Sequence, residues 1–461
     1  MSTPPGMAQS FVEHAVATST ADDCVVIVHD RTSANLRWAN NTLTTNGVMT
    51  GLDVTVVSFV GAATGSMTGS VTSQAGVTAL VEAADRAARA ASPAEDANEL
   101  VRDAVSPDWD DASVPTDIHV YDALAPALGE AFGRAAAEDR VLYGFVNHEM
   151  TTTYLGSTTG VRLRHVQPTG HVGCTAKSAD LTRSAWVGAA TRDFTDVDPL
   201  AIDTELTRRL GWAERQVDLP PGRYDTILPP TAMADLMIDA YWYAGARTAH
   251  EGQSVYSRRG GGTRIGDRIA KPGVTLFSDP AYAGLECQPF ASATSSGNED
   301  SVFDNGLPLG RTDWIRDGEL TSLIQTRHSA AMTGQPVTPG IDNLVLSVDG
   351  AAGSIDDLVA GTERGLLLTC LWYIREVDPQ SLLLTGITRD GVYLVENGEI
   401  TGAVNNYRFN ESPVDLLNRF THASATVPAF SREWGDDYFS RTAMPALRVP
   451  DFNMSSVSQA Q

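Results

Sequence analysis

The chain has 461 residues, of which 42% are hydrophobic and 20% are charged. At roughly 100–200 residues per domain this length predicts about two to four domains, and the composition excludes a disordered or fibrous protein. Asp and Glu number 57 against 33 Lys and Arg, so the formal charge is −24. That balance argues against direct attraction to nucleic acid or to an anionic membrane.

The first 91 residues predict a helix, a run of strands and a second helix. Apolar residues recur at helical spacing in 6–18 and 76–91. Short alternating segments separated by Asn, Gly and Thr predict strands at 24–28, 35–39, 43–49, 53–60 and 63–71. Residues 92–115 are acidic and contain proline, so we expect a linker there.

The same order of elements follows in residues 116–221, with a helix at 121–139, strands within 141–187 and a helix at 198–212. Residues 222–450 form a larger unit in which a strand at 224–228 leads into an apolar helix at 231–243. Further strands are predicted at 274–277, 319–325, 344–347, 366–373, 391–396 and 402–409, a helix at 413–420, and a frayed tail at 451–461. The fold class is therefore α+β: a helix–β-meander–helix unit, a similar middle unit and a β-rich C-terminal domain.

The cysteines and the N-terminal sequence exclude several protein classes. Cys24, Cys174, Cys287 and Cys370 are far apart, which argues against a disulfide scaffold and a Cys-rich zinc site. The N-terminal residues carry no basic stretch followed by an apolar run, and no segment approaches the roughly 18 apolar residues of a membrane span. We expect a cytoplasmic protein with no membrane partner.

Two His-Glu pairs raise the question of a zinc peptidase. Zinc peptidases of the HExxH type need a second imidazole one helical turn after the first. Neither His148-Glu149 nor His250-Glu251 is followed by such a residue. We interpret both pairs as surface or hairpin residues.

A three-ligand metal site can also be written for His165, His171 and Cys174, which flank a Pro-Thr-Gly turn at 168–170. These side chains could approach one another across a hairpin. Strand alternation leaves the faces of the two histidines open, so strand packing or solvent exposure is the favoured interpretation.

Several segments, taken in order, resemble a known family. They are GDRIA at 266–270 with VTLFSDP at 274–280, FDNGLP at 303–308 with IRDGEL at 315–320, and VENGEI at 395–400 with Asn410 and the helix at 414–420. RWANN at 37–41 and the strands after it fit the family's first domain. Over about residues 8–450 the chain is similar to the TldD/TldE (PmbA) family of zinc-dependent peptidases.

The resemblance implies a particular branch of that family. The TldD branch carries HExxxH on the helix that corresponds to 231–243, and a cysteine near the C-terminus completes its zinc site. Here Met237, Ile238 and Trp242 stand at those positions, and no cysteine follows Cys370. Thioether, aliphatic and indole groups do not supply the ligands that zinc needs. The chain therefore resembles the TldE branch, and we expect no catalytic, cofactor-binding or metal-binding residue in it.

This implies a metal-free subunit, inactive alone, of a heterodimeric zinc metallopeptidase that acts on peptides or unfolded segments. A TldD-like partner would hold the zinc, and this chain would help to close the chamber and hold the peptide by strand addition. Two alternatives stay open: a non-enzymatic binding or scaffold protein that retains the fold, and a self-sufficient hydrolase with another site, such as His165, His171 and Cys174.

Overall fold

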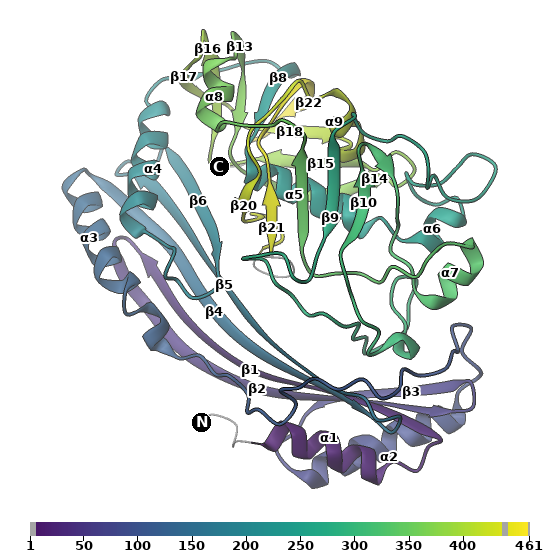
Figure 1. Ribbon diagram of the computed structural model, residues 1–461. Coiled ribbons are helices and arrows are strands. Elements are labelled where there is room, and N and C mark those ends of the chain that lie inside the picture. The colour runs from purple at the N-terminus through teal and green to yellow at the C-terminus, as the bar shows by residue number, and fades with distance from the viewer. Residues whose placement is uncertain (1–5, 436–440, 460–461) are drawn as a thin grey trace.

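The computed structural model describes residues 6–435 and 441–459, and three sheets dominate it (Figure 1). The first sheet is antiparallel, in the order β3-β2-β1-β4-β5-β6. Its strands are β1 Asp23–Ala39, β2 Thr42–Val60, β3 Ala63–Ser70, β4 Arg140–Ser157, β5 Arg162–Ser178 and β6 Ser184–Thr191. The predicted segments 24–28 and 35–39 are parts of one strand, and so are 43–49 and 53–60. In each case the strand continues through the polar stretch between two apolar segments, because polar side chains can point to either face of a sheet without interrupting the strand.

One face of this long, curved sheet carries four helices (Figure 1). They are α1 Met7–Thr18 and α2 Gln74–Ala90 over one half, and α3 Leu124–Ala137 and α4 Pro199–Trp212 over the other. Cys24, Val26 and Leu36 in β1 share this face, as expected for residues two or more positions apart in even steps. The opposite face turns toward residues 222–459.

The two predicted N-terminal units, 1–91 and 116–221, contribute to this one sheet. Strand β1 of the first unit pairs with β4 of the second, from Val25 opposite Ser157 to Trp38 opposite Gly144. The boundaries at 91–92, 115–116, 221–222 and 450–451 stay a prediction, and residues 1–5 and 460–461 lie outside the described residues.

The remaining part of the chain holds two sheets around a common apolar core. The smaller sheet, in the order β11-β10-β9-β12-β21-β20, consists of β9 Val274–Ser278, β10 Thr312–Arg316, β11 Glu319–Leu320, β12 Leu344–Val348, β20 Val427–Ala429 and β21 Thr442–Met444. The larger has the order β14-β15-β18-β22-β8-β13-β16-β17-β7, with β19 beside β22. Its strands are β7 Gln216–Val217, β8 Gly222–Leu228, β13 Arg364–Leu368, β14 Leu371–Asp378, β15 Leu383–Thr388, β16 Val392–Glu396, β17 Glu399–Val404, β18 Tyr407–Glu411, β19 His422–Ala423 and β22 Leu447–Val457.

Short helices fill the space between these sheets and at their margins: α5 Pro230–Trp242, α6 Ala246–His250, α7 Arg327–Thr333, α8 Ile355–Ala360 and α9 Pro413–Arg419. Two 3-10 turns, η1 Ile118–Tyr121 and η2 Val302–Asp304, complete the elements. Helix α5 touches β20 and β21 of the smaller sheet, β8 of the larger sheet, and α9. None of the described helices is long and apolar enough to cross a membrane. The predicted α+β class is confirmed.

Three further details of the sequence prediction are wrong. The tail is not frayed over 451–457, because β22 extends to Val457 and buries Phe452 and Met454 between β8 and β18. The strand predicted at 319–325 ends at Leu320, after which the chain forms loop contacts such as Ile324 N–H to the Ala244 carbonyl. The segments 366–373 and 402–409 are each interrupted, at 369–370 and 405–406, because the chain passes there from β13 to β14 and from β17 to β18, which lie at separate places in the sheet.

Candidate functional site: helix α5 and the adjoining cleft

Helix α5 lies in the core of the C-terminal part of the chain and is buried along almost its whole length. It follows β8 directly, and Pro230 takes its first turn, where a missing N–H costs nothing. Every residue from Ala232 to Tyr241 is buried. Such a helix has no exposed face, which agrees with its apolar sequence on all sides.

The three positions that the resemblance places at the zinc motif differ in their burial. Met237 and Ile238 are completely buried in the apolar core. Trp242, at the C-terminal end of α5, is half-buried and packs edge-on against Trp434, with ring centroids 5.0 Å apart. This donor set does not fit zinc, since none of the three offers an imidazole, thiolate or carboxylate. Within residues 6–435 and 441–459, no cluster of three or more His, Cys, Asp or Glu side chains could hold a metal ion.

Two buried carboxylates are the feature of α5 that sequence reasoning missed. Asp235 accepts hydrogen bonds from the Ser431 hydroxyl (2.6 Å) and the Glu433 amide (3.0 Å). Asp239, one turn later, accepts from the Trp434 indole N–H at 3.3 Å. Together they hold residues 431–434 against the helix, a contact we call the carboxylate clasp. The only signal in the sequence was an Asp pair at i and i+4 in an otherwise apolar helix.

Burial decides the protonation of the clasp. Desolvation raises the pKa of Asp235 to about 8 and that of Asp239 to about 7, and the nearby Glu433 carboxylate adds to both shifts. Both carboxyls are therefore mostly protonated in weakly acidic solution. Glu433 itself accepts the Tyr373 and Ile374 amides at 3.1 Å each, so it turns away toward β14.

A polar cleft lies between the first sheet and the C-terminal part of the chain, and it reaches the end of α5. One section, about 380 Å³ in volume, lies over the face of the first sheet opposite its helices. Its lining includes His29, Arg31, Glu149, His165, His171 and Arg441. A second section of about 320 Å³ contains Tyr241 and Trp242. Gln288, Ser292 and Asp342 line both sections, so the two sections are adjacent.

The cleft contains both hydrogen-bond donors and hydrogen-bond acceptors. Burial lowers the pKa of His29 to about 4, helped by the Arg31 charge, and burial also lowers the pKa of His165. These imidazoles are therefore neutral near pH 7 and can donate through one nitrogen and accept through the other. Arg441 is held by the Asp342 carbonyl (2.9 Å) and the Thr169 hydroxyl (3.2 Å). The arrangement suits recognition of amides and carboxylates.

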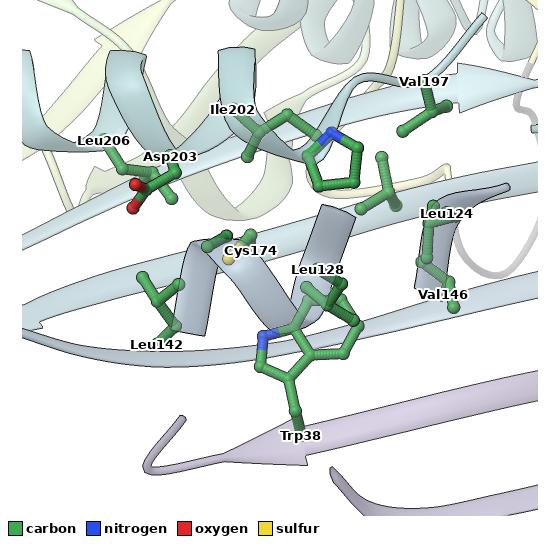
Figure 2. Close-up of a pocket in the computed structure, with 13 residues that line it drawn as sticks. Trp38, Leu124, Leu128, Leu142, Val146, Cys174, Val197, Ile202, Asp203 and Leu206 are labelled. Carbon is green, nitrogen blue, oxygen red and sulfur yellow. The ribbon is translucent and has the colours of Figure 1, made fainter. Parts of the chain in front are cut away.

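The structure separates the two histidines, His165 and His171, from Cys174. His165 and His171 both line the cleft, where His165 bonds Gln167 (3.0 Å) and His171 stacks on Phe430 with centroids 5.3 Å apart. Cys174 is an odd number of residues away and lies on the opposite face of β5. Figure 2 shows it beside Trp38, Leu142 and Leu206, around an apolar cavity of only about 20 Å³. Burial raises the pKa of the Cys174 thiol to about 12.

The His-Glu pairs lie in different settings, and one interpretation needs correction. His148 is buried rather than on the surface, held by the Thr116 hydroxyl (2.6 Å) and the Arg192 carbonyl (2.7 Å). It faces the helices while Glu149 faces the cleft, because successive side chains of a strand alternate. His250 ends the five-residue helix α6, and Glu251 follows it.

Comparisons with known proteins agree with this architecture. Residues 221–456 match the PmbA/TldA metallopeptidase C-terminal domain, and residues 24–91 match domain 1 of the same metallopeptidases. The fold is similar to that of TldE from Thermococcus kodakarensis, with a TM-score of 0.74 at 15% identity over 96% of this chain and 99% of that one. A proposed DNA gyrase modulator from Thermotoga maritima gives 0.74 at 17%, again over 96% and 99%. Another, from Bacteroides thetaiotaomicron, gives 0.73 at 15% over 98% of each chain. No curated protein matched.

Proposed function

Because the chain belongs to the PmbA/TldD metallopeptidase family, we propose that it is a TldE-like, metal-free subunit of a two-chain zinc peptidase that acts on peptides or unfolded segments. A TldD-like partner holds the zinc and performs the hydrolysis. This chain contributes one wall of the chamber in which an extended peptide is held.

The observation that carries this proposal is the condition of helix α5. A catalytic zinc site needs three protein ligands and a fourth position open to substrate. At the corresponding places α5 presents Met237 and Ile238, both fully buried, and Trp242, which lines the second section of the cleft. The helix therefore supports the wall of a cleft without supplying ligands to it.

The cleft supplies what a binding wall requires. A peptide in extended form offers alternating amide donors and carbonyl acceptors, and the neutral His29 and His165 can satisfy either. Gln288 lies where the two sections meet, and Arg441 offers a charge to an acidic side chain or a chain end.

The test compares the purified chain with and without a TldD-like chain that bears HExxxH. Metal content by mass spectrometry and hydrolysis of an unfolded model peptide are measured for each chain and for the mixture. We expect no stoichiometric zinc and no hydrolysis from this chain alone, and hydrolysis from the mixture above that of the partner alone. Stoichiometric zinc together with proteolysis in the isolated chain would refute the proposal.

The same mixture separates this function from that of a scaffold protein that has kept only the fold. A scaffold would neither co-purify with the TldD-like chain nor change its activity. A self-sufficient hydrolase would instead lose turnover when His165, His171 or Cys174 is replaced by alanine, although these residues lie on opposite faces of β5.

A further inference from the structure

Arg441 is a partly buried arginine for which the described chain supplies no carboxylate partner. Its guanidinium donates through Nε to the Asp342 carbonyl (2.9 Å) and through Nη1 to the Thr169 hydroxyl (3.2 Å). Both acceptors are neutral, so they orient the guanidinium without compensating its charge. A guanidinium has five N–H groups, and the other three have no partner within the residues that the structure describes.

The other partly buried arginines are compensated. Apart from Arg441 and Arg432, every arginine that is buried or partly buried in the described chain forms an ion pair with Asp or Glu. The Arg432 guanidinium lies over two aromatic rings, 5.0 Å from the centroid of Trp186 and 4.3 Å from that of Trp372. The π faces of such rings stabilise a cation. Among the described residues, Arg441 has neither kind of compensation.

Arg441 lies where two hollows of the molecule meet. Together with Gln167 and Thr169 it lines the 380 Å³ section of the cleft over the first sheet. The same three residues line a neighbouring hollow of about 340 Å³, which residues 284–286 border. Withdrawing a guanidinium from water is unfavourable unless an opposite charge compensates it. The uncompensated charge therefore favours an anion at the junction of these two hollows.

We propose that Arg441 binds a carboxylate of the peptide and makes this chain selective for peptides that carry one. The inference rests on the proposed function, since it takes the ligand to be a peptide. The carboxylate comes either from the C-terminal end of the peptide or from an Asp or Glu side chain. Both sources present two oxygens in a plane, which match the planar guanidinium of arginine.

The charges around Arg441 fit an anion with a single negative charge. The section of the cleft over the first sheet also contains Arg31, Glu149 and Asp342. Arg31 already pairs with Asp53 at 3.8 Å, so Arg441 is the cation of this section that still lacks a partner in the described chain. A carboxylate brings one charge to this one guanidinium. A doubly charged phosphate would leave one negative charge uncompensated beside Glu149 and Asp342.

The test compares three N-acetylated peptides of the same uncharged sequence, with binding measured by fluorescence anisotropy. The first ends in a free carboxylate, the second ends in an amide, and the third ends in an amide but contains one glutamate. Each is added to the full chain alone and to its mixture with a TldD-like chain. We expect the first or the third peptide, or both, to bind at least about tenfold more tightly than the second, as charge-assisted hydrogen bonds to a carboxylate would give. The peptide that is preferred identifies the source of the carboxylate.

Substitution of Arg441 tests the assignment to this residue. Arg441→Gln should weaken the carboxylate peptides to the level of the amide peptide, and Arg441→Lys, which keeps the charge, should retain part of the preference. Arg223→Gln is the matched control, because it changes the net charge equally. Arg223 also lacks an ion pair in the described chain, donates to the Asp451 carbonyl (3.0 Å) and lies on β8, outside these hollows. Urea unfolding verifies that each variant is folded.

Four results would overturn the inference: no binding of any of the three peptides, equal binding of all three to the wild type, a preference that survives Arg441→Gln, or an equal loss of preference in Arg223→Gln. Failure of the proposed function would be recognised separately. A mixture that does not hydrolyse peptides, although the chain prefers carboxylate peptides through Arg441, would refute the proposed function and leave this inference standing. A mixture that hydrolyses all three peptides with the same KM would refute this inference alone.

Discussion

The carboxylate clasp makes a prediction in which two substitutions of one residue act in opposite ways. Asp235→Ala removes the acceptor for the buried Ser431 hydroxyl and for the partly buried Glu433 amide. An unsatisfied buried polar group costs about 1–3 kcal/mol, so two cost about 2–6 kcal/mol of unfolding free energy. Asp235→Asn keeps a carbonyl oxygen in the same place, so it should cost little at pH 6.

The effect of Asp235→Asn on the unfolding free energy depends on pH. The pKa of Asp235 is raised from 3.8 to about 8 by burial, so between those values unfolding releases its proton. The stability that this group contributes is complete below pH 3.8 and is lost as the pH rises through 8. Each pH unit in between costs about 1.4 kcal/mol, so the step from pH 6 to pH 8 costs about 3 kcal/mol. Asparagine does not titrate and escapes this loss.

The assay is urea unfolding of the wild type, Asp235→Asn and Asp235→Ala at pH 6 and pH 9, with Asp451→Asn as an exposed control. The advantage of Asp235→Asn over wild type should grow with pH, while Asp235→Ala should be the least stable variant at pH 6. An unchanged difference between wild type and Asp235→Asn across this range would refute the reasoning. Equal losses for Asn and Ala at pH 6 would refute the role of the two hydrogen bonds.

Three further outcomes are expected. Gly144→Ala should lower the unfolding free energy by about 2–3 kcal/mol in a denaturation assay, because its Cβ would lie 2.3 Å from the Trp38 ring. In the same assay Gly129→Ala, on an open side of α3, should raise the unfolding free energy by about 0.5–1 kcal/mol. A thiol reagent should modify the four buried cysteines only on unfolding, and fast reaction of the native chain would contradict their burial. Arg441→Gln should raise KM for a peptide in the mixture with a TldD-like chain and leave the fold intact; an unchanged KM would exclude Arg441 from binding.

Local patterns predicted the helices better than the sheets. The helices expected at 6–18, 76–91, 198–212 and 231–243 lie within two residues of α1, α2, α4 and α5, since their apolar spacing is a local property. The pairing of β1 with β4, across more than a hundred residues, has no local signal. The strand breaks expected inside β1 and β2 were wrong for a related reason. A polar stretch ends a strand only when the chain turns there. In β1 the pairing with β2 and β4 continues through the polar stretch, so the strand does not end.

The candidate site, too, could be predicted only in part from the sequence. The absence of zinc ligands at Met237, Ile238 and Trp242 could be predicted from the helix sequence and the resemblance alone. The clasp could not, because Asp235 meets Ser431 across 196 positions of sequence. The faces of His165 and His171 were left open by the sequence, although the odd separation of each from Cys174 along one uninterrupted strand would have placed that cysteine on the opposite side.

Helix α5 differs from a zinc-binding helix in more than three side chains. Histidines introduced at 237 and 242 would start from positions of which one is fully buried in apolar core and the other packs on Trp434. Neither leaves the open coordination position that catalysis requires. The clasp adds a second constraint, since residues 431–434 are bonded to Asp235 and Asp239 and lie against this side of the helix. A zinc site would need that segment to move and the helix to open toward the cleft. The burial of α5 and the clasp therefore agree with the proposed role of this helix as a support for the wall of the cleft.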